Sequence, residues 1–544
     1  MSQTLQQLMI LVQRAQRPAA LALATDLHAQ GERHPLVLML AAERLEEQRR
    51  FAQAAVLLKE ALRDADGEPE LWRRYGVVLG KQGLLQEAHA ALAEAFDIAP
   101  DQLAIRMALA TACYRLGDLD VATTHFEALA RDQPDSPDPL GALATIAAQR
   151  GDGPRAADFA RRALGLAPDH LPARIAQARA ALVGGDASGA ERLADSLLDR
   201  LGRTDDHRIA LLGLRADARD ALGRHDEAFL DYVARNVLLV VQYRPALAAS
   251  GTERRLDQSR RLAEWAGQLD PEAWAASGVP AESLTRPCTG HLFILGFPRS
   301  GTTLLEKALA GHEAILTLPE IDCLGDAAGH FLADRAALDR LARLPATEIA
   351  ALRDRYFAAV SKLAGPLAGK LVVDKLPLHA IALPLIARLF PDARIILSLR
   401  DPRDVVLSGF RRRFQMNAAM FELLTLQGAA DYYDAVMSLV ERYRTRLRLD
   451  LHALRHEDLV RDFEGEVGKV LALVGLRWTE SIRDFASRAA AHARTPSDYQ
   501  LKRGLNSEGI GTWRHYAAPL KPVMPVLERW IEHWGYAGEQ PGGD

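Results

Sequence analysis

The sequence predicts two unlike parts, an N-terminal superhelix of α-helical repeats and then an α/β domain with a parallel sheet. Alanine, glycine and proline recur with one fixed period in the first part. Beyond about residue 289, short apolar runs alternate with helical patterns instead. At 544 residues the chain is too long for a single hydrophobic core, so two or three domains are expected.

The period of the N-terminal part is 34 residues, and three residue types share it: Ala20, Ala54, Ala88, Ala122, Ala156 and Ala190; Gly83, Gly117, Gly151 and Gly185; Pro100, Pro134 and Pro168. This is the tetratricopeptide period. Glycine ends the first helix of each unit, alanine lets the second helix pack closely, and proline closes the unit. Gly223 and Ala228 follow after 38 residues, so four residues are inserted near 201–207. We expect six to seven hairpins over residues 1–240 with a concave surface, and a helical linker over 241–288.

The second domain is expected over residues 289–540. Its candidate strands are Leu292–Leu295, Leu371–Val373, Arg394–Leu399 and Leu449–Leu454. Strands that alternate with helices predict a parallel sheet covered on both faces. Ligands of such sheets bind at the carboxyl ends of the strands.

The first candidate strand leads into a Gly/Pro/Ser/Gly turn and then a helix. Gly296 and Gly301 have the spacing of a phosphate-binding loop, G-x-x-x-x-G-K-[ST], with Thr303 at the hydroxyl position. Such a P-loop-like turn points backbone N–H groups and a helix N-terminus at an anion. Thr302 stands where a nucleoside triphosphate loop has lysine, and Arg299 supplies the cation instead. The sequence therefore predicts a site for a phosphate-like group other than that of ATP or GTP.

A second strand–turn–helix segment, at 393–414, carries Arg400 at the strand end and Ser408 eight residues later. The two segments together resemble the sulfotransferases that use 3′-phosphoadenosine 5′-phosphosulfate (PAPS). The resemblance implies that Arg400 and Ser408 hold the 3′-phosphate of PAPS, with no metal. It also implies a 5′-phosphosulfate loop made of Arg299, Ser300, Gly301, Thr302 and Thr303.

Two residues are similar to catalytic positions of the tyrosylprotein sulfotransferases. Glu320, in Leu-Pro-Glu-Ile, stands at the spacing of that family's general base. Lys375, in Val-Val-Asp-Lys-Leu-Pro, matches the lysine that steadies the transferring group, and Arg299 would neutralise the phosphosulfate. The alternatives are a salt-bridged surface glutamate at 320, and at 375 a solvated lysine or a partner of Asp374.

The same resemblance covers further positions. Arg412 stands twelve residues after Arg400, as in that family's 3′-phosphate cluster. The segment Ser-Asp-Tyr-Gln-Leu-Lys-Arg resembles a loop that covers the cofactor. It implies a catalytic role for Ser497 and cofactor binding by Gln500 and Lys502.

Two positions depart from the family pattern. His456 replaces a tyrosine, and Thr512 replaces a cofactor-binding lysine. We expect His456 to line the cofactor site and Arg514 to supply the lost charge. These departures put acceptor specificity in doubt more than sulfonate chemistry.

The leading hypothesis is a PAPS-dependent sulfotransferase whose repeat array recruits the acceptor, a partner protein or a second subunit. The resemblance favours a peptide or protein tyrosine as acceptor, and a saccharide, a lipid or a small hydroxyl compound stay open. One alternative is a kinase-like P-loop enzyme, and another is a repeat scaffold with an inert domain. All proposed cofactor residues lie beyond 290, so a chain that begins near 285 is expected to keep cofactor binding.

Charge, hydropathy and cysteine content argue against several classes of protein. The net charge of −4 gives no basic field for nucleic acid, and no window of 18 or more apolar residues predicts a membrane span. Cys113, Cys288 and Cys323 are too few and too scattered for a disulfide framework or a zinc site. A cytoplasmic protein is expected, with homo-oligomerisation left open.

Overall fold

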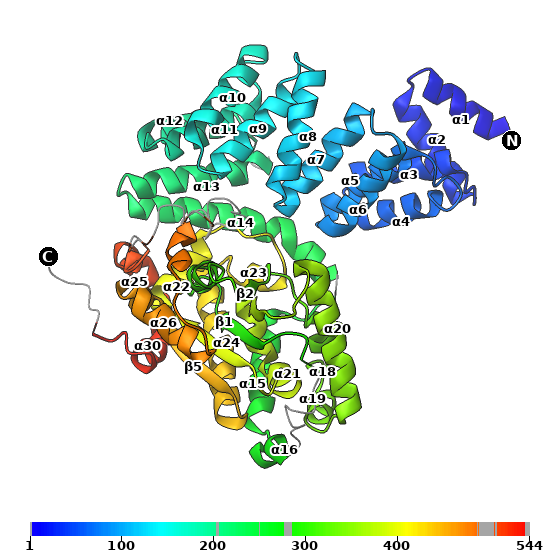
Figure 1. Ribbon diagram of the computed structural model, residues 1–544. Helices are drawn as coiled ribbons and strands as arrows, with labels where there is room; N and C mark the ends of the chain where they lie inside the picture. The colour runs from blue at the N-terminus through cyan, green and yellow to red at the C-terminus, as the bar shows by residue number, and fades with distance from the viewer. Residues whose placement is uncertain are drawn as a thin grey trace. The chain divides into compact units, whose positions relative to one another are not determined.

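The computed structural model describes residues 3–202, 206–249, 251–276, 286–486, 488, 505, 507 and 509–538. The chain divides into two compact units, Met1–Gly202 and Arg203–Asp544. The predicted fold class is confirmed, because helical repeats come first and a parallel sheet among helices follows (Figure 1). None of the described helices combines the length and apolar character needed to cross a membrane.

Helices of the first unit pack against their neighbours along the chain. In its described part they form six hairpins: α1 (Gln3–Gln13) with α2 (Arg17–Ala29), α3 (Pro35–Glu47) with α4 (Phe51–Ala61), α5 (Pro69–Gln82) with α6 (Leu85–Ile98), α7 (Leu103–Leu116) with α8 (Leu119–Asp132), α9 (Pro137–Gln149) with α10 (Gly153–Leu166), and α11 (Leu171–Val183) with α12 (Ala187–Leu198).

The structure shows why alanine and glycine recur in these hairpins. Each periodic alanine lies in a second helix, and all six are buried: Ala20, Ala54, Ala88, Ala122, Ala156 and Ala190. Gly83 and Gly117 end α5 and α7 in the left-handed region, with φ of 85° and 83°. Only glycine adopts that conformation without strain.

The second unit begins with one more hairpin, made of α13 (Asp206–Ala221) and α14 (His225–Ala249). Gly223 has φ of 75° and Ala228 is buried, so this hairpin keeps the repeat pattern. The sequence placed it in the repeat array, whereas its contacts count it with the α/β unit. Two helices then lead towards the sheet, α15 (Arg255–Gly267) and α16 (Pro271–Ala276).

Five parallel strands form one sheet in the order β2-β3-β1-β4-β5. They are β1 (Gly290–Gly296), β2 (Ile315–Thr317), β3 (Leu371–Lys375), β4 (Arg394–Leu399) and β5 (Asp450–Arg455). Four of them match the predicted strands. The edge strand β2 was not predicted, because its three residues include a single buried one and make no apolar run.

Helices and 3-10 turns connect and cover the strands. After β1 and β2 come α17 (Thr302–Leu309), α18 (Gly325–Phe331), α19 (Arg335–Ala342) and α20 (Ala346–Ala364). After β3 and β4 come η2 (Pro377–Ala382), α21 (Leu383–Leu389), α22 (Pro402–Arg411), α23 (Ala418–Glu422) and α24 (Leu426–Arg446). After β5 come α25 (His456–Arg461), α26 (Phe463–Leu473), η3 (Glu480–Asp484), η4 (Thr512–Tyr516), α29 (Ala517–Leu520), η5 (Lys521–Val523) and α30 (Met524–His533).

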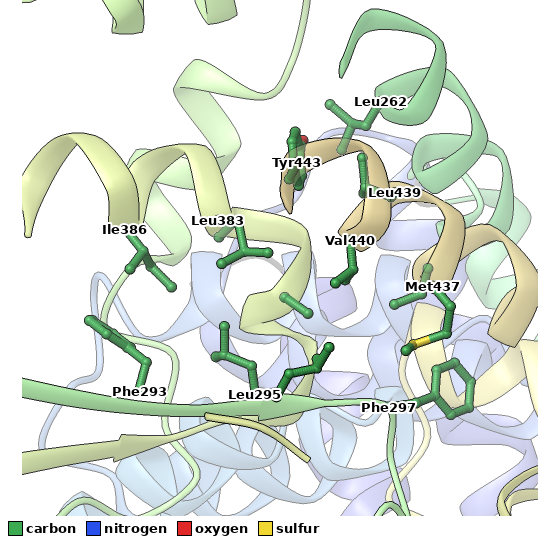
Figure 2. Close-up of a cluster of buried hydrophobic side chains, with 14 of the residues drawn as sticks. Leu262, Phe293, Leu295, Phe297, Leu383, Ile386, Met437, Leu439, Val440 and Tyr443 are labelled. Carbon is green, nitrogen blue, oxygen red and sulfur yellow. The ribbon is translucent and has the colours of Figure 1, made fainter. Parts of the chain in front are cut away.

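The central strand β1 is buried on both faces of the sheet. Phe293 and Leu295 point into a core with α21 and α24 (Figure 2). Leu292 and Ile294 point to the opposite face and pack with α17 and α26. Alternate side chains of a strand face opposite ways, so this continuous apolar run is what a central parallel strand requires. The rigid sheet holds the carboxyl ends of β1, β3, β4 and β5 at one edge.

Candidate functional site

The loop between β1 and α17 requires glycine at two positions. A Cβ atom at Gly296 would lie 2.6 Å from both the Ser300 hydroxyl oxygen and the Ser398 carbonyl oxygen. A Cβ atom at Gly301 would lie 2.5 Å from Nδ1 of His456, whose ring packs against the loop from the start of α25. Both distances are too short for a real Cβ. The close packing therefore explains the spacing of the two glycines.

Arg299 joins this loop to the second motif. Its φ of 77° lies in the left-handed region, which costs a non-glycine residue free energy and often marks a functional site. Its Nε donates a hydrogen bond of 3.0 Å to the Ser408 hydroxyl on α22. Its carbonyl accepts one of 3.3 Å from the Arg400 guanidinium. The loop after β1 and the turn after β4 thus form one site, with Thr302 and Thr303 buried at the start of α17.

Positive charge is concentrated at this site. Burial and the neighbouring charges of Arg412 and Arg400 lower the pKa of Arg299 to about 9, although Glu320 opposes this shift. Arg412 follows α22 directly, and its backbone N–H donates to the Ser408 carbonyl, whereas its side chain has no hydrogen-bond or ion-pair partner within the described part of the chain. Like charges held close together repel unless an anion neutralises them. This arrangement therefore favours binding of an anionic group.

Three buried polar atoms around the loop have no hydrogen-bond partner among the described residues. They are the Ser300 hydroxyl oxygen, Nε of Arg400 and Nδ1 of His456. Buried polar groups are almost always paired, so unpaired ones indicate a missing partner. Burial and the charges of Arg400 and Arg299 lower the pKa of His456 to about 3, so its imidazole is neutral at pH 7. An anion with several oxygen atoms fits this set.

Glu320 and Lys375 are in direct contact. The Lys375 ammonium donates a hydrogen bond to Glu320 and lies 3.0 Å from the carboxylate of Glu306 on α17. Burial alone would lower the pKa of Lys375, but the two carboxylates raise it. The lysine is therefore charged and fixed between two acids. Glu306 was missed from the sequence, although it stands one helical turn after Thr302, on the same helix face.

A buried polar network supports the segment that carries Glu320. His379, in η2, contacts Asp322 through Nε2 at 2.9 Å, and its Nδ1 lies 3.5 Å from Asp374 of β3. The Tyr356 hydroxyl donates to Asp374 at 2.7 Å. Burial alone would lower the pKa of His379, but the hydrogen bond to Asp322 and the nearby Asp374 raise it to about 9. The protonated imidazole thus ties the loop after β2 to the neighbouring strand.

We expect this network to make folding stability depend on pH. The folded pKa of His379 is raised from 6.5 to about 9, so its contribution is full below pH 6.5 and is lost as pH rises towards 9. The free energy of unfolding should fall across this window by up to about 1.4 kcal/mol per pH unit. Denaturant titrations at pH 6.5, 7.5 and 8.5 measure the slope. His379→Asn keeps an N–H donor for Asp322 but does not titrate, and an unchanged slope in this variant would exclude His379 as its source.

The η4 segment lies against the turn after β4. The carboxylate of Asp404, on α22, accepts hydrogen bonds from the backbone N–H groups of Gly511, at 2.7 Å, and Trp513, at 2.8 Å. Arg400 donates to the carbonyl of Gly509. The Arg514 guanidinium lies 5.1 Å from the ring centroid of Trp513.

The remaining predicted residues are Thr512, Ser497, Gln500 and Lys502. The Thr512 hydroxyl donates to the carbonyl of Gly509 at 3.2 Å, so it turns towards its own backbone. Ser497, Gln500 and Lys502 lie outside the described residues. Besides Glu306, sequence reasoning missed Asp322, His379 and Asp404. Spacing gave no signal for them, because each acts through a partner that is distant in the sequence.

Comparisons with known proteins match the two parts of the chain to two different families. Residues 291–480 match the model described as "Sulfotransferase family", and residues 81–146 match that of the tetratricopeptide repeat. An uncharacterised protein of Aquifex aeolicus (strain VF5) is 24% identical over 255 residues, 44% of this chain and 33% of the relative. Nodulation protein NoeE of Sinorhizobium fredii (strain NBRC 101917 / NGR234) is 28% identical over 257 residues, 41% of this chain and 59% of the relative. The chain thus spans about a third and about three fifths of these relatives' own length.

Solved structures of repeat proteins resemble part of the chain. A tetratricopeptide repeat protein from Parabacteroides merdae has 21% identity and a TM-score of 0.31, covering 38% of this chain and 86% of its own. PilF of Pseudomonas aeruginosa has 16% identity and a TM-score of 0.31, covering 36% of this chain and 90% of its own. From the two family models, the chain carries tetratricopeptide repeats followed by a sulfotransferase-family domain.

Proposed function

We propose that the second unit is a PAPS-dependent sulfotransferase that moves a sulfonate group to an acceptor hydroxyl. One observation carries the proposal. The glycine loop contains Arg299, Arg400 donates to the loop and Arg412 lies near it, and the buried Ser300 hydroxyl of the loop has no partner among the described residues. A site of this kind is built for a multiply charged anion. The match to the sulfotransferase family model over 291–480 supports PAPS as that anion.

The residues at the site fit such a cofactor. We assign the 5′-phosphosulfate to the loop of Gly296–Thr303, where backbone N–H groups, Arg299 and the start of α17 converge. We assign the 3′-phosphate to Arg400, Ser408 and Arg412, since all three follow β4. His456, as a neutral imidazole against Gly301, borders the loop. Bound PAPS would supply the activated sulfonate, and these side chains would hold and orient it.

We assign the general base to Glu320 rather than Glu306. The Glu320 side chain is 38% exposed and that of Glu306 is 7% exposed, so only Glu320 is open to an acceptor hydroxyl. When Glu320 takes up a proton it loses its charge, and Lys375 keeps Glu306 as an ionised partner. The lysine thus stays charged throughout, and a charged lysine can stabilise negative charge that develops on the transferring group.

We propose a peptide or protein tyrosine as the acceptor, with a saccharide, a lipid or another hydroxyl compound as the alternatives. The tetratricopeptide repeats support a role in recruiting the acceptor or a protein partner, because repeat superhelices offer extended binding surfaces. Incubation with ³⁵S-labelled PAPS and fractionated cell extract, followed by identification of the labelled species, tests transfer and identifies the acceptor. Absence of any labelled product in all fractions would contradict the proposal.

Cofactor choice gives the first binding prediction. Adenosine 3′,5′-bisphosphate should raise the melting temperature of the protein, because a ligand that binds the folded state stabilises it by mass action. A concentration of 100 times Kd should add about 2.7 kcal/mol. ATP or GTP with Mg²⁺ should have a much smaller effect, since Thr302 replaces the lysine of nucleoside triphosphate loops. A larger shift with ATP and Mg²⁺, measured by differential scanning fluorimetry, would instead favour a kinase-like enzyme.

A further inference from the structure

Helix α14 holds the carboxyl end of α22. The Arg235 guanidinium donates to the carbonyls of Arg411, at 2.9 Å, and Phe410, at 3.1 Å. The Asn236 amide donates to the Phe410 carbonyl at 3.0 Å. Both α14 side chains are buried. The last carbonyls of a helix have no partner within it, so α14 supplies what α22 lacks at its end.

Asp220 lies at the carboxyl end of α13, the other helix of the hairpin, and contacts three residues. The Asp220 carboxylate accepts hydrogen bonds from the Arg411 guanidinium and from the Tyr516 hydroxyl, and it contacts Nδ1 of His225 at 3.0 Å. Burial alone would raise the pKa of Asp220, but Arg411, Tyr516 and His225 lower it, so the carboxylate is charged. The Arg411 guanidinium also lies 4.9 Å from the Tyr516 ring centroid. Asp220 therefore joins the end of α22 to the end of η4.

These two segments form one side of the anion site. Helix α22 carries Ser408, which binds Arg299, and Arg412 follows it directly. We infer that the α13–α14 hairpin is a positioning element of the anion site, and that Asp220 sets where the arginines at the end of α22 lie. The inference rests on the proposed function, because it takes Arg412 to face the 3′-phosphate.

Ring contacts support the same coupling. Phe229 of α14 lies 5.4 Å from Phe410 and 6.4 Å from Tyr516, measured between ring centroids. Arg215 of α13 forms a two-pronged ion pair with Asp231 of α14, with bonds of 2.8 and 2.6 Å. The hairpin is thus braced internally. A charge change at Asp220 should therefore act on α22 and η4 more than on the hairpin itself.

The test compares two nucleotides on the full-length chain. Isothermal titration gives the Kd of adenosine 3′,5′-bisphosphate and of adenosine 5′-monophosphate, which lacks the 3′-phosphate. In Asp220→Asn the bisphosphate should bind about tenfold more weakly, since a charge-assisted contact that places the arginines is lost. The monophosphate should bind almost as in the wild type. Glu227→Gln, an exposed acid on α14, is the matched control and should leave both Kd values unchanged.

The ratio of the two Kd values decides the inference. A general loss of folding would weaken both nucleotides together, whereas loss of positioning lowers only the preference for the 3′-phosphate. If Asp220→Asn does not fold, Tyr516→Phe decides, because it removes one hydrogen bond and keeps the ring; a smaller drop in the ratio is then expected. If the wild type prefers the bisphosphate to the monophosphate and these variants keep that preference, the inference is overturned but the proposed function is not. No wild-type preference would overturn the proposed function, and the inference with it.

Discussion

Glu320→Gln should reduce turnover by ~10²-fold or more, while the affinity for adenosine 3′,5′-bisphosphate changes little. The amide keeps the shape of the side chain and a hydrogen-bond acceptor for Lys375. It cannot take up the proton of an acceptor hydroxyl, so the loss falls on the transition state. Steady-state kinetics with a labelled acceptor give kcat, and isothermal titration gives the bisphosphate Kd.

Two further measurements separate this role from a structural one. Glu313→Gln changes an exposed glutamate before β2 and should leave kcat unchanged. The free energy of unfolding of Glu320→Gln should stay close to that of the wild type, because Lys375 keeps its ion pair with Glu306. Intact turnover together with a clear loss of stability would make Glu320 a structural partner of Lys375. His456 would not replace it as the base, because burial and the charges of Arg400 and Arg299 lower its pKa to about 3 and make it a poor proton acceptor.

Arg400→Ala should weaken bisphosphate binding by about 10- to 100-fold, which corresponds to the loss of one charge-assisted contact. The side chain serves the ground state and the transition state alike, so kcat/KM should fall with the affinity and kcat should fall less. Adenosine 5′-monophosphate should lose much less affinity, since Arg400 is assigned to the 3′-phosphate. Isothermal titration with both nucleotides measures the difference.

A matched arginine provides the control for this variant. Arg448 is exposed and precedes β5, at the opposite edge of the sheet from the site, so Arg448→Ala should bind both nucleotides as the wild type does. Arg400 also donates to the backbone carbonyls of Arg299 and Gly509. Arg400→Lys keeps the charge without the planar fork, and it should recover part of the affinity. Equal losses for both nucleotides in Arg400→Ala would contradict the assignment to the 3′-phosphate.

Local signals were enough to predict most of the fold. A shared 34-residue period identified the hairpins, because each alanine and glycine meets a requirement within its own unit. Three of the four predicted strands, β1, β3 and β4, were evident because they are buried on both faces and read as apolar runs, whereas the edge strand β5 has a single buried residue, Leu454. Strand β2 gave no such signal, because it has only three residues and one of them is buried. The place of the α13–α14 hairpin depends on contacts with α22 and η4, which its own pattern does not encode.

The residues of the site likewise fall into those that local motifs predict and those that depend on distant contacts. Arg299, Arg400 and Ser408 stand in contiguous strand–turn–helix motifs, and the structure brings all three together. Glu306 became visible only when the parallel pairing of β1 with β3 placed α17 beside Lys375. Asp404 and His379 likewise depend on partners more than fifty residues away in the sequence. Motifs thus predict the atoms that face a ligand better than the residues that hold those atoms in place.

The α13–α14 hairpin at the start of the second unit also determines where the chain can be cut and joined to other repeats. Sequence alone suggested that a chain beginning near residue 285 keeps cofactor binding, yet that cut would remove Asp220, Arg235 and Asn236. The end of α22 would then face water with two uncapped carbonyls and an exposed Phe410. A joint near residue 202 leaves these partners with the sheet. Exchange of the repeats between related proteins should therefore succeed at 202 and fail at 285, because the last repeat-like hairpin belongs to the unit that contains the sheet.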